Sequence, residues 1–449
     1  MWVDEAYNPQ NDGGNLQFSV KINVYGKDGN SLNIKPNAPE LDSNMIAVRY
    51  NGSNWVKADN STNNWYNYDK QEWANAVTVT SDTRDRYLSA SVGTVMSMND
   101  IETMWVWIPR YSYSIGSVDG TNYYGKQGDY LDTIPTRTLP GEIDIKFVDT
   151  NTKDRGTAKY VVSDGIQSNS WYTPDAFTFG DAELSGIWVG KFETSSSNPS
   201  ATYGGGNTTE LDPMIKPNVT SWRYINVSNA FNVSLKMNDE GNRYGFSSDV
   251  DTHMMKNSEW GAVAYLSQSK YGKLGNTNFI GSNKEIYQNK SNQYITGCSW
   301  GKPSGGTSSD YGCQYTYDID INGTGASTTG TIYGIYDMSG GAWEYVMANY
   351  NDVIGSSGFI EPLTLDSKYY NKYTSYDESK ACNGSTCISH GLSEIAGWYN
   401  DYQSMVIEQY PWLVRGGNYY NDIDAGSYNF GVVAGGTSGS YSYRLTLTL

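Results

Sequence analysis

The sequence predicts an α+β fold built mostly of short strands, with few helices and long irregular loops. Only 18% of the 449 residues are charged, whereas Gly (48) and Tyr (39) are abundant. That composition is typical of extracellular β-rich proteins rather than of cytosolic enzymes. Short segments alternate apolar and polar residues, as half-buried strands do, and two others place apolar residues at helical spacing.

Four segments predict strands. The near-continuous apolar run at 104–109 (MWVWIP) predicts a buried strand, and 187–194 (IWVGKFET) predicts another. Asn51-Gly52 lies between two apolar-rich runs, which is a hairpin signal. Residues 18–25 alternate and predict a half-buried strand that must pair with the body of the protein or with another subunit, because a lone strand is marginally stable.

Two helices are predicted. The first begins at a capping Asn226 or Ser228, and the second at a capping Asn257. Apolar positions at helical spacing follow each cap: Val227, Ala230, Phe231 and Leu235 in the first helix, and Trp260, Val263, Ala264 and Ser267 in the second.

The chain divides into three predicted regions. Residues 1–40 form an N-terminal β segment that could serve assembly or anchoring. Residues 41–100 form a β-rich region that packs on the main domain, and residues 101–449 form that domain. The middle region carries an aromatic cluster of Trp65, Tyr66, Tyr68 and Trp73.

The net charge of −17 argues against nucleic acid, whose phosphates need Lys and Arg to displace counterions, and against anionic membrane surfaces. No apolar run is long enough to span a bilayer, and no signal peptide is recognisable. Two origins therefore stay open: an export or anchoring segment removed ahead of Met1, or an exported particle component that never had one.

The four cysteines fall into two local pairs, Cys298 with Cys313 and Cys382 with Cys387. Proximity favours these two disulfides, which implies an oxidising, extracellular setting. The alternative is a zinc site, but the two histidines, His253 and His390, do not sit beside a pair at finger spacing. No bound metal is predicted.

The segment 334–346 (GIYDMSGGAWEYV) is the strongest single motif. Met338, Trp343 and Val346 supply core, and the Ser-Gly-Gly between them predicts a tight turn. Glu344 is expected to hydrogen-bond locally and hold structure. A catalytic carboxylate is the alternative at this position.

This motif resembles the "GL-x-DM-x-GN-V-W-E-W" motif of the formylglycine-generating enzyme, or sulfatase-modifying factor, family. Four further segments resemble family motifs in the same order, and the resemblance spans about residues 101–449. It implies a C-type-lectin-like fold, with Trp343, Glu344, Arg415, Gly416, Gly417 and Arg444 as scaffold. The four segments are 104–109, 189–195 (VGKFETS), 254–267 (MMKNSEWGAVAYLS), and the pair 412–417 (WLVRGG) and 441–445 (YSYRL).

The departures from the family argue against its chemistry. The family's enzymes bind copper through a cysteine pair soon after the RGG motif, whereas 418–422 here reads NYYND, and carboxylates and amides do not replace thiolates for Cu(I). Two isolated histidines cannot supply the iron site of the related sulfoxide synthases. The calcium motifs of sugar-binding C-type lectins are near misses at 361–363 (EPL) and 398–401 (WYND). No cofactor is predicted, and a structural calcium elsewhere is an open alternative.

The C-terminal segment 415–445 combines a fixed frame with Asn, Tyr, Asp, Ser and Gly, the residue types of turns and of recognition loops. A polar, Gly-rich β-meander is the alternative interpretation. The segment also resembles the C-terminus of target proteins of diversity-generating retroelements, which vary surface residues on this fold. Tyr419 and Tyr428 could instead point inward. The predicted ligand contacts are Asn418, Tyr420, Asn421, Asp422, Asp424, Ser427, Asn429 and Thr437.

These observations predict a non-enzymatic ligand-binding protein, a receptor-binding protein or adhesin, on a bacterial surface, pilus-like fibre or phage particle. Its partner would be a host or cell-surface protein or a glycan. The alternative is a structural subunit of an extracellular filament or particle, self-assembled through the strand at 18–25. The sequence contains no GxSxG or HExxH motif, so an enzyme is not predicted.

Overall fold

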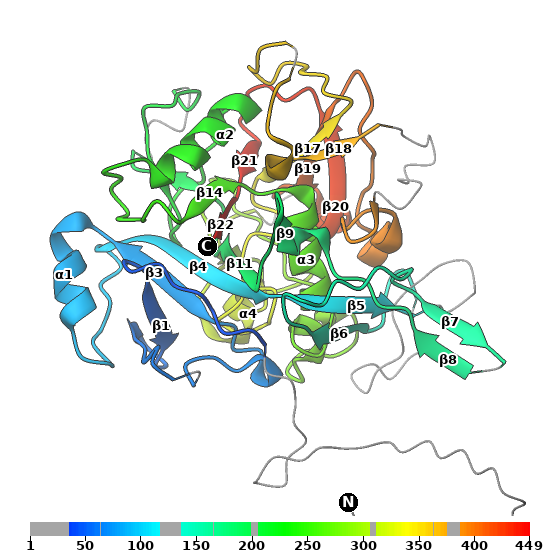
Figure 1. Cartoon of the computed structure of the whole chain (residues 1–449), viewed down its shortest axis with the longest axis horizontal. Coiled ribbons are helices and arrows are strands. Elements are labelled where there is room, and N and C mark those ends of the chain that lie inside the picture. The colour runs from blue at the N-terminus through cyan, green and yellow to red at the C-terminus, as the bar shows by residue number, and fades with distance from the viewer. Residues whose placement is uncertain are drawn as a thin grey trace, which may run out of the picture. The chain divides into compact units, whose positions relative to one another are not determined.

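A seven-stranded antiparallel sheet runs through one part of the protein, and a five-stranded mixed sheet lies in another (Figure 1). The computed structural model describes residues 36–62, 64–116, 136–164, 166–198, 205–305, 311–361, 363–374 and 387–449. The predicted strand at 18–25 lies outside these ranges. Strands predominate and helices are few, which confirms the mixed α+β class.

The larger sheet has the strand order β14-β22-β11-β4-β3-β1-β2. Its centre is β4, whose nine residues are all buried because strands flank it on both sides. The apolar run at 104–109 therefore forms a buried strand, as predicted. The strands are β14 (Asp251–Met254), β22 (Leu445–Thr448), β11 (Gly186–Gly190), β4 (Ile101–Pro109), β3 (Asn75–Val79), β1 (Ile46–Tyr50) and β2 (Trp55–Lys57).

The smaller sheet carries the C-terminal segment. Its order is β18-β17-β19-β20, and β21 also pairs with β17. β19 pairs antiparallel with both β17 and β20, so the RGG motif is held from two sides. The strands are β18 (Asn371–Tyr373), β17 (Trp343–Tyr350), β19 (Trp412–Gly416), β20 (Gly426–Val433) and β21 (Tyr441–Tyr443).

Five two-stranded pairs complete the β structure. They are β5 (Tyr111–Ile115) with β6 (Ile143–Phe147), β7 (Tyr160–Ser163) with β8 (Ile166–Asn169), β9 (Thr178–Phe179) with β10 (Ala182–Glu183), β12 (Ser195–Ser196) with β13 (Pro213–Met214), and β15 (Cys298–Ser299) with β16 (Tyr315–Thr316). The helices are α1 (Ser81–Ser89), α2 (Val227–Leu235), α3 (Asn257–Ser267) and α4 (Asp320–Thr324).

Both predicted helices form. Asn226 caps α2, and its side chain accepts a hydrogen bond from the Asn229 amide at 2.9 Å. The predicted cap of α3 was wrong, because Lys256 is the cap and Asn257 is the first helical residue. The Asn257 amide is buried instead and donates to the Tyr373 hydroxyl and the His390 carbonyl. No apolar periodicity in the sequence indicates α1, whose one buried side chain is Tyr87.

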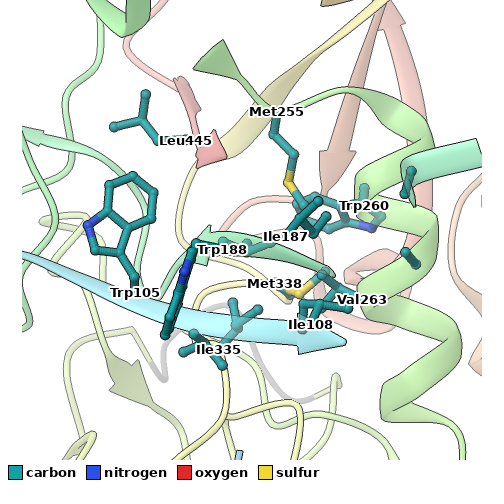
Figure 2. Close-up of a cluster of buried hydrophobic side chains, with 14 of the residues drawn as sticks. Trp105, Ile108, Ile187, Trp188, Met255, Trp260, Val263, Ile335, Met338 and Leu445 are labelled. Atoms are coloured by element: carbon teal, nitrogen blue, oxygen red, sulfur yellow. The ribbon is translucent and has the colours of Figure 1, made fainter. Parts of the chain in front are cut away.

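The core is aromatic, as the sparse aliphatic composition requires. Nine Trp side chains are essentially fully buried. Figure 2 shows side chains of β4, β11 and α3 meeting around Met338 from the GIYDMSGG segment. The predicted cluster of Trp65, Tyr66, Tyr68 and Trp73 also forms, with neighbouring ring centroids 5.3–6.2 Å apart.

Within the described residues, no helix combines the length and apolarity needed to cross a bilayer. Residues 41–100 and 101–449 share the larger sheet through the pairing of β3 with β4. The division into three regions stays a prediction.

Candidate binding face

Two buried arginines, Arg415 and Arg444, support the C-terminal face, which is formed by segment 415–445. Arg444 donates to Glu344 Oε2 at 2.8 Å, to the Gly190 carbonyl at 2.8 Å and to the Tyr336 carbonyl at 2.9 Å. These bonds join β17, β11 and the segment before β17 to the end of the chain. Burial raises the pKa of Glu344 to about 7, although Arg444 opposes the rise. Glu344 was expected to hydrogen-bond nearby backbone, whereas its carboxylate accepts from Arg444, a hundred residues later in the chain.

Arg415 is the second anchor. Its guanidinium donates to the Gly391 carbonyl at 2.9 Å and lies 5.5 Å from both the Trp260 and Phe430 rings. Burial lowers the pKa of Arg415 to about 9. Gly416 and Gly417 follow with φ of 82° and 72°, in the left-handed region that other residues enter at a cost. The two glycines turn the chain out of β19 toward the surface.

The segment after this turn is the exposed part of the face. Tyr420 is 48% exposed, Ile423 is 57% exposed, and Asp424 and Thr437 are also exposed. Asn421 and Asp422 are half-buried. Asp422 forms an ion pair of 2.9 Å with the buried Lys290, which ties the segment to the body of the protein.

Three predicted contacts do not face solvent: Asn418, Ser427 and Asn429 are buried. The side chain of Asn418 accepts from the Tyr420 amide, and the Asn429 carboxamide donates to the Asp424 carbonyl. Ser427 lies in β20, where residues 426–431 are all buried. Successive side chains of β20 still point to opposite faces, but both faces are covered, so alternation does not separate exposed from buried residues there. These three residues support the face rather than forming it.

The two tyrosines singled out in this segment differ in their exposure. Tyr428 points inward, and its hydroxyl donates to Gln268 Oε1 at 2.8 Å. Tyr419 is half-buried and meets the rings of Tyr294 and Tyr311 edge-on, with centroids 5.1 and 5.2 Å away. Tyr420 is therefore the tyrosine of this turn that stands in solvent.

A pocket of about 550 Å³ adjoins the exposed segment. Residue type alone could not have located it, because its walls come from segments far apart in the sequence. Burial raises the pKa of its Glu285 to about 8, against the opposing effects of Ser304 and Lys273. The lining residues are Thr138, Ser282, Asn283, Glu285, Trp300, Lys302, Pro303, Ser304, Gly305, Tyr399, Asn400 and Ile423.

The disulfide Cys298–Cys313 is present, as predicted, and it closes the segment that supplies one wall of this pocket. Within that segment Trp300 lies 4.3 Å from the Lys290 ammonium, the partner of Asp422. The buried Lys290 therefore contacts both Trp300 in the pocket wall and Asp422 in the exposed segment. Cys387 is also disulfide-bonded, and Cys382 lies outside the described residues.

The described residues contain no group of three or more His, Cys, Asp or Glu side chains placed to hold a metal ion. At the near-miss calcium motifs, Glu361 is exposed, whereas Asp401 is buried and accepts from the Tyr428 amide at 2.9 Å. Pro362 lies outside the described ranges.

Comparison with known proteins adds little. No family model matches the chain, and no curated protein matches it. Among solved structures, the chain is similar to Treponema denticola variable protein 1, with 12% sequence identity and a TM-score of 0.28. The match covers 66% of this chain and 94% of that one. A TM-score this low does not establish a shared fold or function.

Proposed function

We propose that this chain is a non-enzymatic binding protein and that its ligand contacts the exposed segment 419–424 together with the adjoining pocket. The observation that carries the proposal is the contrast between the two layers of this face. Exposed Tyr420, Ile423 and Asp424 stand directly on a layer of fully buried, hydrogen-bonded residues. A rigid support of this kind lowers the entropy lost when a ligand binds.

The chemistry of the exposed layer suits recognition. Tyr gives a large contact area at low conformational cost, and Asn and Asp supply adaptable hydrogen bonds. Ile423 belongs both to the segment and to the pocket lining, so one ligand could contact both. Of the contacts expected from the sequence, the proposal keeps Tyr420, Asn421, Asp422, Asp424 and Thr437, and it adds Ile423 and Asn400.

The partner we propose is a host or cell-surface protein or a glycan, and the setting is a bacterial surface, a pilus-like fibre or a phage particle. The disulfide supports an extracellular setting. The resemblance of 334–346 and 412–417 to the formylglycine-generating enzyme family supports a scaffold of that type. The absence of cysteine from 418–422 supports a role without the copper chemistry of that family.

Binding is tested with the labelled full chain on arrays of glycans and of purified surface proteins. The triple variant Tyr420→Ala, Ile423→Ala, Asp424→Ala should bind its array hit at least about tenfold more weakly, because it loses one aromatic, one apolar and one charged contact. Its unfolding free energy should change by no more than about 1 kcal/mol, since these side chains are exposed.

The matched control is the triple variant Tyr410→Ala, Ile360→Ala, Glu361→Ala, which removes the same chemistry from exposed positions elsewhere. This control should bind as the parent does. Equal weakening in both variants, or unfolding of the first, would show that segment 419–424 is not the contact surface.

Diversification of this face is a separate part of the proposal, and it is tested by sequencing the last forty codons across many cells of one culture and its close relatives. We expect changes within codons 418–440, concentrated at the exposed positions, with Arg415–Gly417 and Arg444 unchanged. Identical codons in all cells would contradict diversification. The face could then still bind one constant ligand.

A further inference from the structure

A second pocket, sharing no residue with the first, gathers positive charge on this acidic protein. Its volume is about 260 Å³, just below the roughly 300–1,000 Å³ of pockets for drug-sized ligands. Four of its lining residues are basic and one is acidic, in a chain with a net charge of −17. The lining residues are Lys153, Arg155, Asp175, Thr178, Gly180, Lys256, Ser258, Ser367, Lys368, Tyr370 and Asn371.

Lys256 is the buried member of the set. Its side chain is 5% exposed, and its ammonium lies 3.5 Å from Glu259 Oε1 and 5.0 Å from the Phe179 ring centroid. The two Glu259 oxygens are engaged elsewhere, one with His253 at 3.0 Å and the other with the Lys256 amide at 2.8 Å. An ammonium has three donors, so one long contact leaves Lys256 donors to offer a ligand.

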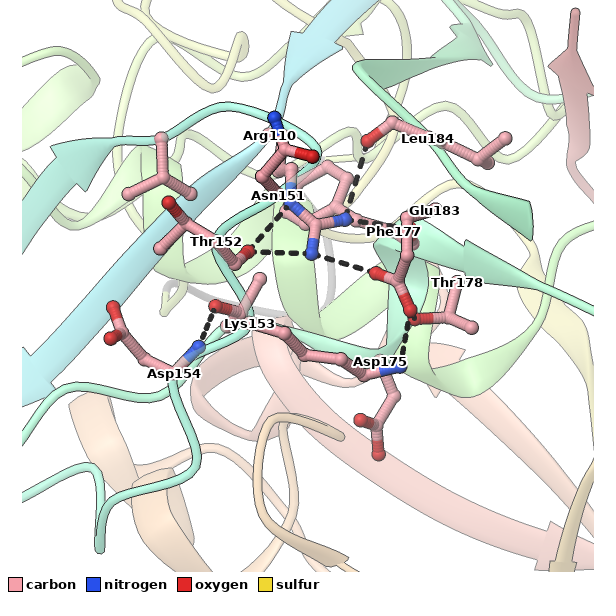
Figure 3. A network of polar contacts seen from close by, with 12 residues as sticks. Arg110, Asn151, Thr152, Lys153, Asp154, Asp175, Phe177, Thr178, Glu183 and Leu184 are labelled. Atoms are coloured by element: carbon pink, nitrogen blue, oxygen red, sulfur yellow. Dashed lines mark hydrogen bonds and ion pairs between the residues drawn. The ribbon is translucent and has the colours of Figure 1, made fainter. Parts of the chain in front are cut away.

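The other three cations line the same pocket as Lys256 and are partly exposed. Arg155 pairs with Asp175 at 3.2 Å, and Lys368 pairs with Asp251 at 3.6 Å. Lys153 pairs with Glu183, a carboxylate that also pairs with the buried Arg110 (Figure 3). With Arg110 included, five cations share four carboxylates: Asp175, Glu183, Asp251 and Glu259.

The start of α3 lines the pocket, and a buried histidine shares two of these carboxylates. Lys256 and Ser258 bracket the first residue of α3, an eleven-residue helix, so the positive end of its dipole faces the pocket. Behind Lys256, the buried His253 lies between Asp251 and Glu259 at 2.9 and 3.0 Å. Burial opposes protonation of His253, but the two carboxylates outweigh burial and raise its pKa.

We propose that this pocket binds a tetrahedral oxyanion, a phosphate or sulfate group that is free or carried as a monoester. Lys256 contacts the anion from the floor, while Arg155, Lys153 and Lys368 contact it from the rim. The hydroxyls of Ser258 and Ser367 add neutral donors. The size of the pocket and the number of donors fit one such group rather than an extended polyanion.

The test is titration calorimetry of the full chain with inorganic phosphate, inorganic sulfate, glucose 6-phosphate and glucose, at constant ionic strength. We expect one bound anion per chain and no binding of glucose. A stronger signal for glucose 6-phosphate than for phosphate would assign the site to a monoester, and the reverse would assign it to the free anion. No saturable binding of any anion up to about 20 mM, or binding of glucose, would overturn the proposal.

Variants locate the bound anion. Arg155→Gln and Lys368→Gln should each weaken binding about tenfold, because each removes one charge-assisted hydrogen bond. Both side chains are partly exposed, so the variants should fold. Lys256→Met should abolish binding, and its thermal unfolding shows whether it folds.

Arg86→Gln is the matched control. Arg86 also pairs with a carboxylate, Asp100 at 2.8 Å, and also lies over a tyrosine ring, at 4.5 Å compared with 4.7 Å for Arg155. This control should bind the anion as the parent does. Equal weakening in Arg86→Gln and Arg155→Gln would mean that anion binding depends only on the net charge of the protein. That result would overturn the proposal that the anion binds in this pocket.

Discussion

Arg444 and Glu344 form a fully buried ion pair, with both side chains at 0% exposure. Such a pair offsets its desolvation cost only while both partners are present. The Arg444 guanidinium also donates to two carbonyls, so these bonds would hold it in place if Glu344 were removed. The pair therefore makes the last strand dependent on the GIYDMSGGAWEYV segment, a hundred residues earlier.

Glu344→Ala should lower the free energy of unfolding by about 3–5 kcal/mol, because it removes the carboxylate that is hydrogen-bonded to the buried Arg444 guanidinium. Urea denaturation measures the change. The control is Glu72→Ala, which breaks an exposed pair with Arg49 at 3.3 Å and should cost no more than about 1 kcal/mol. Similar small costs for both variants would contradict the anchoring role of Glu344.

Glu285 makes stability depend on pH. Burial raises its pKa to about 8 from a usual value of 4.5. Between those values the folded protein keeps a proton that the unfolded chain releases, so stability should fall as pH rises from about 4.5 to 8. Glu285→Gln, which resembles the protonated carboxyl, should make this decline shallower by at least about 1 kcal/mol at pH 8, since one pKa unit corresponds to about 1.4 kcal/mol. Melting temperatures across that pH range measure the slope, and an identical slope in the variant would contradict this assignment.

At the scale of elements, the strands before residue 101 complete the larger sheet. β3 pairs with β4 along its whole length. Two indole groups also bond across to later segments: Trp55 Nε1 donates to the Tyr317 hydroxyl at 3.2 Å, and Trp73 Nε1 donates to the Tyr271 carbonyl at 2.8 Å. Removing these strands would expose an unpaired edge of β4 and leave one buried and one partly buried partner unbonded.

A chain of residues 101–449 should therefore lack a cooperative thermal transition and should aggregate during size-exclusion chromatography. The control is the chain Pro36–Leu449, a compact unit by itself, which should keep the transition. A cooperative, monomeric 101–449 chain would show that β1, β2 and β3 form an accessory layer rather than an essential part of the sheet.

The elements also differ in how far their sequence predicts them. α2 has an apolar stripe and a capping Asn, and both features could be recognised in the sequence. α1 has neither signal, since its residues are mostly charged or polar and it lies within the connection between β3 and β4. The cap of α3 was misassigned because Asn257 has cap chemistry but is used in a buried contact with Tyr373 and His390.

At the scale of the whole molecule, the net charge of −17 describes only the average surface. The fold brings Lys153, Arg155, Lys256 and Lys368 from three segments into one pocket. No local charge run marks that pocket in the sequence, so the net charge by itself would argue against any anionic ligand. The pocket beside the C-terminal face is likewise assembled from segments beginning near 138, 282, 300 and 399.

Features that depend on neighbours along the chain could be predicted from the sequence. These are the strand class, the hairpin at Asn51-Gly52, a helix cap at Asn226 or Ser228, and the local Cys298–Cys313 pair. Packing from distant segments sets which side chains of the C-terminal segment reach solvent. β20 is covered on both faces, so Ser427 and Asn429 are buried, and Asn418 is buried in the turn after β19, whereas Tyr420, Ile423 and Asp424 are exposed. Burial depends on contacts with residues far away in the sequence, whereas caps, turns and short loops depend on the backbone within a few residues.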